Sequence, residues 1–308
     1  MDCPLLRTGT SIEAPATTSA RGVPMHTRRR FTGGALGAAL LAAAGPLAAE
    51  TMPECKRSGF TKAVSAQTVE EQALQQYHQM LEKAETDRAL VPASHPQVQR
   101  LRYIADRIIP FTRDCNSRAA EWKWEINLIG SRQVNAFCMS GGKIAFFWGI
   151  LAEMQLSDDE VAMVMGHEIA HALLEHAREQ MGKNVVTSGA MRLGAALLGL
   201  GQIGDLGAQV GSHLMALKYS RDDEAQADAL GLVLAARAGY DPRAGVTLWQ
   251  KMSTGGGAPP AILSTHPTGP ERIQEIEARL PRAMPVYEAA AKPTRHFAPP
   301  PRGSTSRS

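Results

Sequence analysis

The sequence has few cysteines and few aromatic residues, and neither sign of charge dominates it. Four cysteines occur in 308 residues, and none has the Cys-x-x-Cys spacing of a cysteine zinc site. In an oxidising compartment Cys55 and Cys115 could pair and leave Cys138 free, although spacing alone cannot fix the connectivity. Lysine and arginine number 33 against 30 acidic residues, a net charge of +3. Because no basic stripe carries interleaved aromatics, nucleic-acid binding has no support.

The chain also lacks an uninterrupted apolar run of the length that a transmembrane helix needs. The run from Gly33 to Ala49 is short and contains glycine and proline, and glycines repeatedly interrupt the apolar segment from Gly189 to Leu217. We expect the second segment to form helical connectors that pack on a central helix. Peripheral contact with a membrane surface is the alternative for that segment.

The first 49 residues are typical of an N-terminal extension that ends in an export signal. Three arginines, Arg28 to Arg30, precede Phe31, an apolar stretch rich in Ala, Leu and Gly follows, and small residues precede Ala49. The paired arginines resemble a twin-arginine signal. An ordinary secretory signal with a basic start is the alternative, and Met25 is a second candidate start codon. Either signal would export the mature chain, so we expect a periplasmic location.

The segment from Val161 to Arg178, VAMVMGHEIAHALLEHAR, is predicted to be a buried helix. Ser157 and Glu160 have the Ser-x-x-Glu spacing of a capping box, which marks a helix start. The apolar residues that follow leave almost no polar face, and a helix that is apolar all round is a buried one.

This apolar helix nevertheless carries His167, Glu168 and His171. Residues four apart lie on one helical face, so both imidazoles can reach the same ion. Burying these polar groups without partners would be costly. A zinc ion removes the conflict, because it binds two imidazole nitrogens and leaves the neighbouring carboxylate to act on a water molecule.

A third ligand is expected in the segment from Ser220 to Asp228, which begins another helix. Glu224 and Asp228 are four residues apart and share one face, so Glu224 could bind zinc. Asp228 could hold a histidine in its ligating tautomer or take part in proton transfer. The alternative is a solvated acidic helix start that complements the helix dipole. The upstream His-Glu-x-x-His favours the ligand.

Outside these two helices the pattern predicts an α+β fold. Helices are expected over 69–83, 96–111 and 149–154, and strands over 122–128, 134–139 and 143–147, which would form a small antiparallel sheet before the zinc helix. The expected organisation is an N-terminal extension with export signal (1–49), a helical segment (50–95), a domain that carries the candidate zinc site (96–281) and a disordered tail rich in Pro and Ala (282–308). Within the domain, a Gly/Pro loop covers 253–260 and a final helix runs from Pro270 to Leu280.

His167-Glu168-x-x-His171, followed 53 residues later by Glu224-x-x-Ala227-Asp228 (224 − 171 = 53), resembles the zinc metallopeptidase family of HtpX and the CAAX prenyl protease. The chain is most similar to the soluble periplasmic bacterial branch of these gluzincins. The resemblance covers about Gln97 to Leu280. Three further segments match that branch: Asn135-Ala136-Phe137 with Gly141-Gly142, Gly239-Tyr240-Asp241-Pro242, and Ser264-Thr265-His266-Pro267.

The resemblance implies a mainly helical, zincin-like domain with one zinc ion per subunit and assigns roles to individual residues. The implied zinc ligands are His167, His171 and Glu224, with Glu168 as general base and Asp228 as proton donor. His266 matches a histidine that lies near the metal in some members and can regulate it. Asn135, Ala136 and Phe137 match a strand edge that pairs with substrate backbone. Cys138-Met139-Ser140 departs from the usual Ala/Pro-rich form, which leaves substrate preference open.

The function expected from the sequence is that of an exported zinc metalloendopeptidase (class EC 3.4.24). Its substrates would be unfolded or misassembled envelope proteins, so the protein would serve quality control in the periplasm. The alternative is a latent protease, blocked by His266, that acts mainly as a chaperone or adaptor in outer-membrane protein assembly. The intact Glu168 argues against that alternative. A membrane-embedded prenyl-protein protease would need several long apolar spans, which the sequence lacks.

Overall fold

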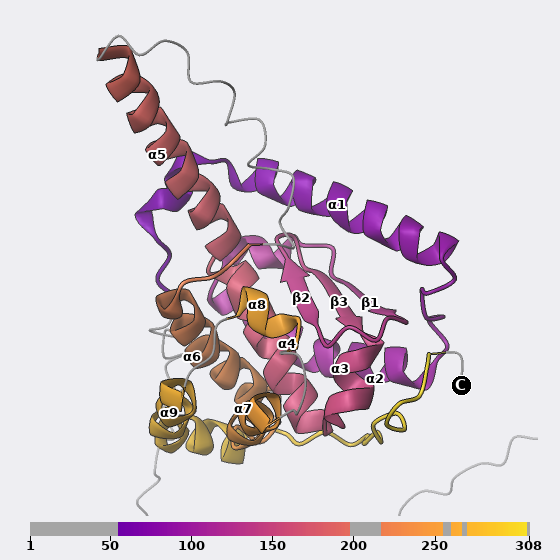
Figure 1. The fold of residues 1–308 in the computed structure, drawn as a ribbon. Coiled ribbons are helices and arrows are strands. Elements are labelled where there is room, and N and C mark those ends of the chain that lie inside the picture. Colours follow the sequence, from indigo (N-terminus) through magenta and orange to yellow (C-terminus); the bar gives the residue numbers. More distant parts are fainter. Residues whose placement is uncertain (1–54, 198–216, 255–259, 267–269, 307–308) are drawn as a thin grey trace, which may run out of the picture. The chain divides into compact units, whose positions relative to one another are not determined.

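The computed structural model describes residues 55–197, 217–254, 260–266 and 270–306 (Figure 1). The chain divides into residues 1–48 and 49–308, and all described residues belong to the second unit. The predicted export signal lies outside the described residues, as do most of the apolar segment 189–217 and of the loop 253–260. None of the helices in the described ranges is both long and apolar enough to cross a membrane.

The described residues form a mainly helical structure around a small sheet, which confirms the predicted α+β class. The strands are β1 (Glu125–Ile129), β2 (Ala136–Met139) and β3 (Lys143–Phe147). Three short 3-10 helices cover Gly59–Ala63, Ser117–Ala120 and Ile109–Asp114, the last of which continues α2. The α-helices are α1 (Ala66–Thr86), α2 (Pro96–Ile108), α3 (Trp148–Met154), α4 (Asp158–Leu173), α5 (His176–Leu197), α6 (Arg221–Arg237), α7 (Ala244–Thr254), α8 (Ile262–Thr265) and α9 (Pro270–Ala289).

The sheet is mixed, so the prediction of a purely antiparallel sheet was wrong. The strand order is β1-β3-β2, with β3 parallel to β1 and antiparallel to β2. Gly141 and Gly142, at φ 84° and 76°, make the tight turn between β2 and β3, a backbone conformation that suits glycine. This hairpin makes β3 the central strand, and β2 is left as an edge strand.

The first strand is shorter than the alternation of Trp122, Trp124, Ile126 and Leu128 predicts, because it begins at Glu125. The indole of Trp122 donates to Glu70 and that of Trp124 to the Ala119 carbonyl. These side-chain hydrogen bonds hold the segment 122–124, which precedes β1, so that it does not pair with a strand.

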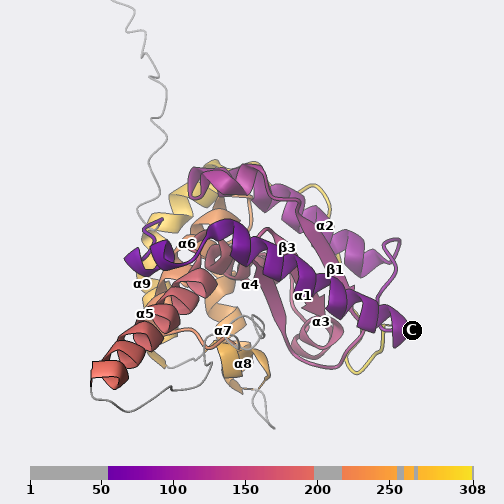
Figure 2. The ribbon, with the colours of Figure 1, turned by 90° about the horizontal axis from the view of Figure 1, so that it is seen from above.

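Both faces of the sheet are covered by helices, as Figure 2 shows for α1 and α2. Ile126, Leu128, Ile144 and Phe146 join the core that contains α2 and α4. On the other face, where alternate residues point, Ile129, Met139 and Ala145 pack with Val69, Ala73 and Tyr77 of α1. The sheet is therefore a rigid wall beside α4.

Helix α4 begins with the predicted capping box, in which Ser157 and Glu160 exchange hydrogen bonds of 3.2 and 2.8 Å. Every residue from Glu160 to Leu173 is buried, because α4 lies between β2 and α6 (Figure 1). A Cβ atom on Gly166 would lie 2.7 Å from the Gly231 carbonyl oxygen of α6. The two helices therefore pack backbone to backbone, which brings short carboxylate side chains of α6 within reach of α4.

The carboxyl-terminal segment differs from the prediction of a disordered tail over 282–308. Helix α9 continues past Leu280 to Ala289, and the residues after it lie against the domain. The indole of Trp148 donates to the Ser304 carbonyl, Gln97 donates to the Ala298 carbonyl, and the Asp158 carboxylate accepts from the Phe297 amide. The composition of this segment indicates that it cannot form a hydrophobic core of its own. Composition cannot indicate that side chains of the domain form hydrogen bonds with the extended backbone of the segment.

A disulfide joins Cys55 to Cys115, with Cα atoms 5.2 Å apart, and Cys138 is a free, buried thiol. This is the pairing that the sequence left open. It attaches the start of the described chain to the segment that follows α2.

Candidate metal centre

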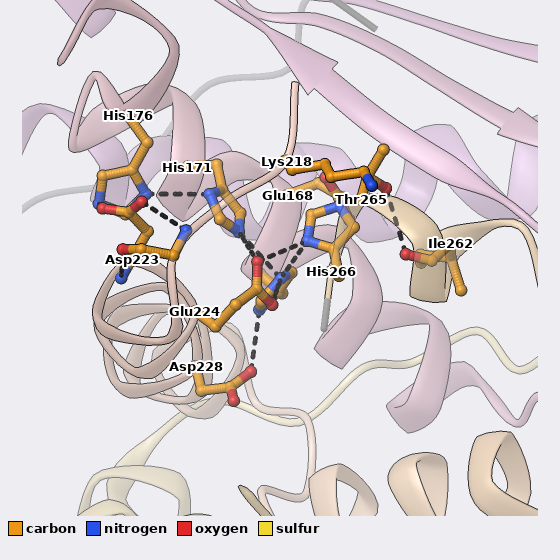
Figure 3. Close-up of polar contacts among 12 residues, drawn as sticks. Glu168, His171, His176, Lys218, Asp223, Glu224, Asp228, Ile262, Thr265 and His266 are labelled. Carbon is orange, nitrogen blue, oxygen red and sulfur yellow. Dashed lines mark hydrogen bonds and ion pairs between the residues drawn. The ribbon is translucent and has the colours of Figure 1, made fainter. Parts of the chain in front are cut away.

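Four buried side chains from three separate segments converge beside the sheet (Figure 3). His167 and His171 come from α4, Glu224 comes from the first turn of α6, and His266 follows α8. Each has an exposed fraction of 6% or less, and their nitrogen and oxygen ligand atoms lie within 4.8 Å of one another. The structure therefore brings together the three predicted zinc ligands and the predicted regulatory histidine.

The contacts inside this cluster favour a bound cation. Nε2 of His171 lies 3.0 Å from Nε2 of His167, and Nδ1 of His266 lies 3.3 Å from that same nitrogen. Oε1 of Glu224 is 2.9 Å from Nδ1 of His266 and 3.4 Å from Nε2 of His171. A neutral imidazole has a single N–H proton, so the three rings cannot all donate to one another and to the carboxylate. A zinc ion fits this donor set, because it binds imidazole nitrogen and carboxylate oxygen.

The first turn of α6 separates structural from functional acids. Ser220 and Asp223 form a second capping box, in which Ser220 Oγ accepts from the Asp223 amide at 3.2 Å and Asp223 Oδ2 accepts from the Ser220 amide at 2.8 Å. Asp223 thus belongs to the helix cap, and it is buried, so it is not the solvated acid that the alternative interpretation of this segment expected. Glu224 and Asp228 instead face α4.

Asp228 binds the side of His167 that faces away from the cluster. Its Oδ1 lies 2.9 Å from Nδ1 of His167, and Arg272 of α9 donates to both of its oxygens at 2.6 and 2.8 Å. Burial raises the pKa of Asp228, but the charge of Arg272 and the hydrogen bond from His167 outweigh burial and hold that pKa below its ordinary value. An ionised carboxylate can only accept, so Nδ1 of His167 carries a proton, and in the neutral, ligating form of the ring Nε2 presents a lone pair.

Glu224 is held ionised by its neighbours. Burial alone would raise the pKa of this carboxyl group, but hydrogen bonds from His167, His171 and His266 outweigh burial and move the pKa far below its ordinary value. Arg272 adds a contact of 2.7 Å from Nη1 to Oε2 of Glu224. A charged carboxylate at this position is the form that binds a metal.

Glu168 lies beside the cluster but takes little part in its contacts. Its exposed fraction is 2%, and its Oε1 has no hydrogen-bonding partner among the described residues, with Nε2 of His266 3.5 Å away. Burial raises the pKa of this carboxyl group, although the neighbouring His266 and His167 oppose the rise. A raised pKa brings a carboxylate closer to the range in which it works as a base at neutral pH.

Two pockets meet at Glu168 and His266. The first encloses about 580 Å³, counting its opening to solvent, and contains the predicted substrate residues Asn135, Ala136 and Phe137 of the β2 edge. The second encloses about 440 Å³ by the same measure and is mainly apolar. Its wall comes from α4, α6, α7, α8 and α9 and includes Met163, Val164, Leu232, Leu248, Trp249, Met252, Ile262 and Ile276.

Arg272 and His176 belong to this centre but were not identified from the sequence. Arg272 stacks over the Trp249 ring at 3.5 Å while it contacts the carboxylates of Glu224 and Asp228. Nothing in the spacing of a lone arginine on a distant helix marks such a role. His176 does stand in the buried segment with His167 and His171, five residues after the second of them.

Comparison with known proteins identifies the family. Peptidase family M48 matches residues 96–280, so the chain belongs to this family and the predicted resemblance is confirmed. It is 34% identical over 208 residues to the mitochondrial metalloendopeptidase OMA1 of Schizosaccharomyces pombe, covering 65% of this chain and 58% of that protein. It is 28% identical over 207 residues to metalloprotease LoiP of Escherichia coli, covering 66% and 78% of the two chains.

A candidate beta-barrel assembly-enhancing protease of Vibrio cholerae is 29% identical over 170 residues, which cover 52% of this chain and 35% of that one. The chain therefore spans little more than half the length of the S. pombe relative and about a third of the V. cholerae relative. Mitochondrial and bacterial members both occur among these proteins.

Proposed function

We propose that the protein is a zinc-dependent endopeptidase that hydrolyses peptide bonds in extended polypeptide segments. The observation that carries this proposal is the convergence of His167, His171 and Glu224 beside Oε1 of Glu168, which has no hydrogen-bonding partner in the part of the chain that the structure describes. The first three residues would hold one zinc ion per subunit. A bound zinc ion supplies Lewis acidity, which polarises a scissile carbonyl group and lowers the pKa of a water molecule.

Glu168 is proposed as the general base and acid. Its Oε1 accepts a proton from the attacking water and returns it to the leaving nitrogen. The raised pKa of Glu168 supports the role of base, because a carboxylate with a raised pKa accepts a proton more readily than one of ordinary pKa.

Asp228 was predicted from the family to be a proton donor, and the contacts support its other predicted role. Asp228 forms hydrogen bonds with Nδ1 of His167 and with two nitrogens of the Arg272 guanidinium group. It therefore keeps Nδ1 of His167 protonated and holds the orientation of the ring. We therefore propose that Asp228 acts through His167 and not on the substrate.

The two pockets indicate how a substrate would lie. An extended segment can add to the outer edge of β2, which pairs with no further strand among the described residues. It would lie next to Asn135, Ala136 and Phe137 and continue past Glu168 into the second pocket. The apolar wall of that pocket suits an apolar side chain adjacent to the scissile bond. Only an unfolded or locally unfolded protein presents such a segment.

His266 is proposed to restrain the site. It lines both pockets, and its ring contacts Glu224 at 2.9 Å, so it is placed to act as an additional metal contact between them. We expect His266→Ala to raise basal cleavage. Unchanged cleavage together with unchanged zinc affinity would exclude this restraint.

The proposed setting is the bacterial envelope, with unfolded or misassembled envelope proteins as substrates. Three observations support this: the signal-like first 49 residues, the Cys55–Cys115 disulfide, which is typical of oxidising compartments, and the similarity to the candidate beta-barrel assembly-enhancing protease of V. cholerae.

Replacement of Glu168 by Gln tests the proposed activity. Wild-type protein should cleave unfolded casein, and a chelator should abolish this cleavage. Because Glu168 is not a ligand, Glu168→Gln should keep stoichiometric zinc while its turnover falls by about 100- to 10,000-fold. Glu121→Gln, at an exposed position, is the matched control and should cleave normally. Retained cleavage by Glu168→Gln would refute the assignment, and suppression of aggregation without any wild-type cleavage would support a chaperone.

A further inference from the structure

The zinc ligands His167 and His171 receive unequal support from the residues assigned so far. Nδ1 of His167 is held by Asp228. Nδ1 of His171 points away from the cluster, and no carboxylate among the described residues holds it. A ligating imidazole usually donates its second N–H to a partner that fixes its tautomer and orientation.

His176 occupies the position of that partner. Its Nδ1 lies 2.9 Å from Nδ1 of His171 (Figure 3), and the exposed fraction of His176 is 1%. The other ring nitrogen, Nε2, has no hydrogen-bonding partner among the described residues and lies 3.9 Å from Oδ1 of Asp223. Asp223 is itself immobilised by the capping box with Ser220.

A break between α4 and α5 places His176 there. In one continuous helix a residue five positions after His171 would be turned about 140° away from it. Instead α4 ends at Leu173, and Glu175 adopts a left-handed conformation at φ 60° before α5 begins at His176. This conformation is uncommon for a residue other than glycine. Arg178 contacts the Glu175 carboxylate at 2.6 Å and stabilises the turn.

Proton counting then fixes the direction of each bond. If Nε2 of His171 binds zinc, its single proton lies on Nδ1, so Nδ1 of His176 must accept. The proton of His176 consequently lies on Nε2, which faces Asp223, a group that can accept it. Tyr219 stacks on the His171 ring with centroids 4.0 Å apart and limits its rotation.

We propose that His176 is a positioning residue for the metal centre: it accepts a hydrogen bond from Nδ1 of His171, presents its own Nε2–H to Asp223, and thereby fixes His171 as a zinc ligand. The proposal rests on the zinc site of the proposed function. Helix α6 then supplies the three carboxylates that bind the metal or support its histidine ligands. Glu224 is the ligand, Asp228 supports His167 directly, and Asp223 supports His171 through His176.

A second metal site is the competing interpretation, because ligand atoms of His176, Glu179 and Asp223 also lie within 4.8 Å of one another. Glu179 contacts Lys183 at 2.7 Å, and one oxygen of Asp223 is engaged by the Ser220 amide. A second cation would have to compete with the Lys183 ammonium group for Glu179, so the structure favours the hydrogen-bonded chain.

Variants of His176 in the full chain test this proposal through metal binding. His176→Leu removes the acceptor and should weaken zinc binding by about 10- to 100-fold, measured by competition with a chromophoric chelator, and should alter the visible absorption of the Co²⁺-substituted protein. His176→Asn restores an acceptor and should recover most of the affinity and the Co²⁺ spectrum. His78→Ala, at an exposed histidine, is the control and should match the wild type.

The outcomes separate this proposal from the proposed function. If the wild type binds no zinc, the zinc site itself fails. If the wild type binds zinc and His176→Leu binds it equally well with the same Co²⁺ spectrum, only the role of His176 is refuted. Two zinc ions per chain, one of them lost in His176→Leu, would establish the second metal site instead.

A measurement on the wild type covers the case in which His176→Leu does not fold. In the zinc-bound protein with ¹⁵N-labelled histidine, the ring shifts should show His176 protonated on Nε2 and unprotonated on Nδ1. The opposite tautomer would refute the proposed direction of the chain.

Discussion

Arg272 is expected to be a main source of stability in the metal centre. Its exposed fraction is 7%, and it compensates two buried carboxylates at once: Asp228 through two bonds of 2.6 and 2.8 Å, and Glu224 through a contact of 2.7 Å. Its guanidinium group also lies 3.5 Å from the centroid of the Trp249 ring. Arg272→Met keeps the approximate length of the side chain but removes the charge and all of the donors.

Removal of one partner from a buried ion pair costs about 3 to 5 kcal/mol, because the remaining charge stays buried without compensation. The cost of Arg272→Met should reach the upper part of this range, since two carboxylates lose a partner and the contact with Trp249 is lost as well. A typical domain is stable by only about 5 to 15 kcal/mol, so this variant should be close to unfolding. Arg272→Lys should fall in between, because it keeps the charge but loses the two-pronged geometry.

Equilibrium unfolding in urea measures this cost. The control is Arg279→Met on the same helix, since Arg279 forms a surface pair with Glu275 at 3.5 Å and should contribute less than about 1 kcal/mol. Asp228→Asn combined with Arg272→Met should cost less than the sum of the single changes, by about 0.5 to 3 kcal/mol. If Arg272→Met cost no more than Arg279→Met, the reasoning about a buried charge network would be wrong.

Three further predictions concern the disulfide, the carboxyl-terminal segment and the apolar pocket. The Cys55–Cys115 bond spans 60 residues, so replacing both cysteines by Ala should lower the unfolding free energy by about 4 kcal/mol by the chain-entropy estimate. Urea unfolding of this variant should be insensitive to reductant. Equal stability of the oxidised wild type and the variant would contradict the estimate. Removal of residues 290–308 deletes, among other contacts, the hydrogen bonds to Gln97, Trp148 and Asp158. At about 1 kcal/mol each, the loss of these three bonds alone should lower the Tm by at least about 6 °C, whereas removal of a disordered segment would leave it unchanged. A Cβ atom on Gly245 would lie 3.3 Å from Cγ2 of Ile276, so Gly245→Val should fill the second pocket and keep the zinc content. Cleavage next to large apolar side chains should fall at least about 10-fold relative to cleavage next to small ones. An unchanged cleavage profile on a peptide library would show that the pocket does not select substrate.

The parts of the site that were predicted correctly depend on local spacing. The start of α4 at its capping box and the common face of His167 and His171 follow from residues within one or two helical turns. The mixed sheet and the ordered carboxyl-terminal segment were not predicted, because each depends on partners far away in the chain. Trp148, for example, binds the carbonyl of Ser304, 156 residues later.

The sequence by itself determined that a buried helix carries a pair of imidazoles and a carboxylate, since burial and periodicity are properties of one segment. It also placed Glu224 and Asp228 on one face of a second helix. Only the tertiary structure decided what each of these groups does. The close contact of α4 and α6 at Gly166 and Gly231 sets Glu224 against the histidines, and Arg272 from α9 keeps Asp228 ionised. The turn at Glu175 brings His176 back to His171. Proton positions and charge states depend on these distant contacts, and for that reason spacing along the chain could not reveal them.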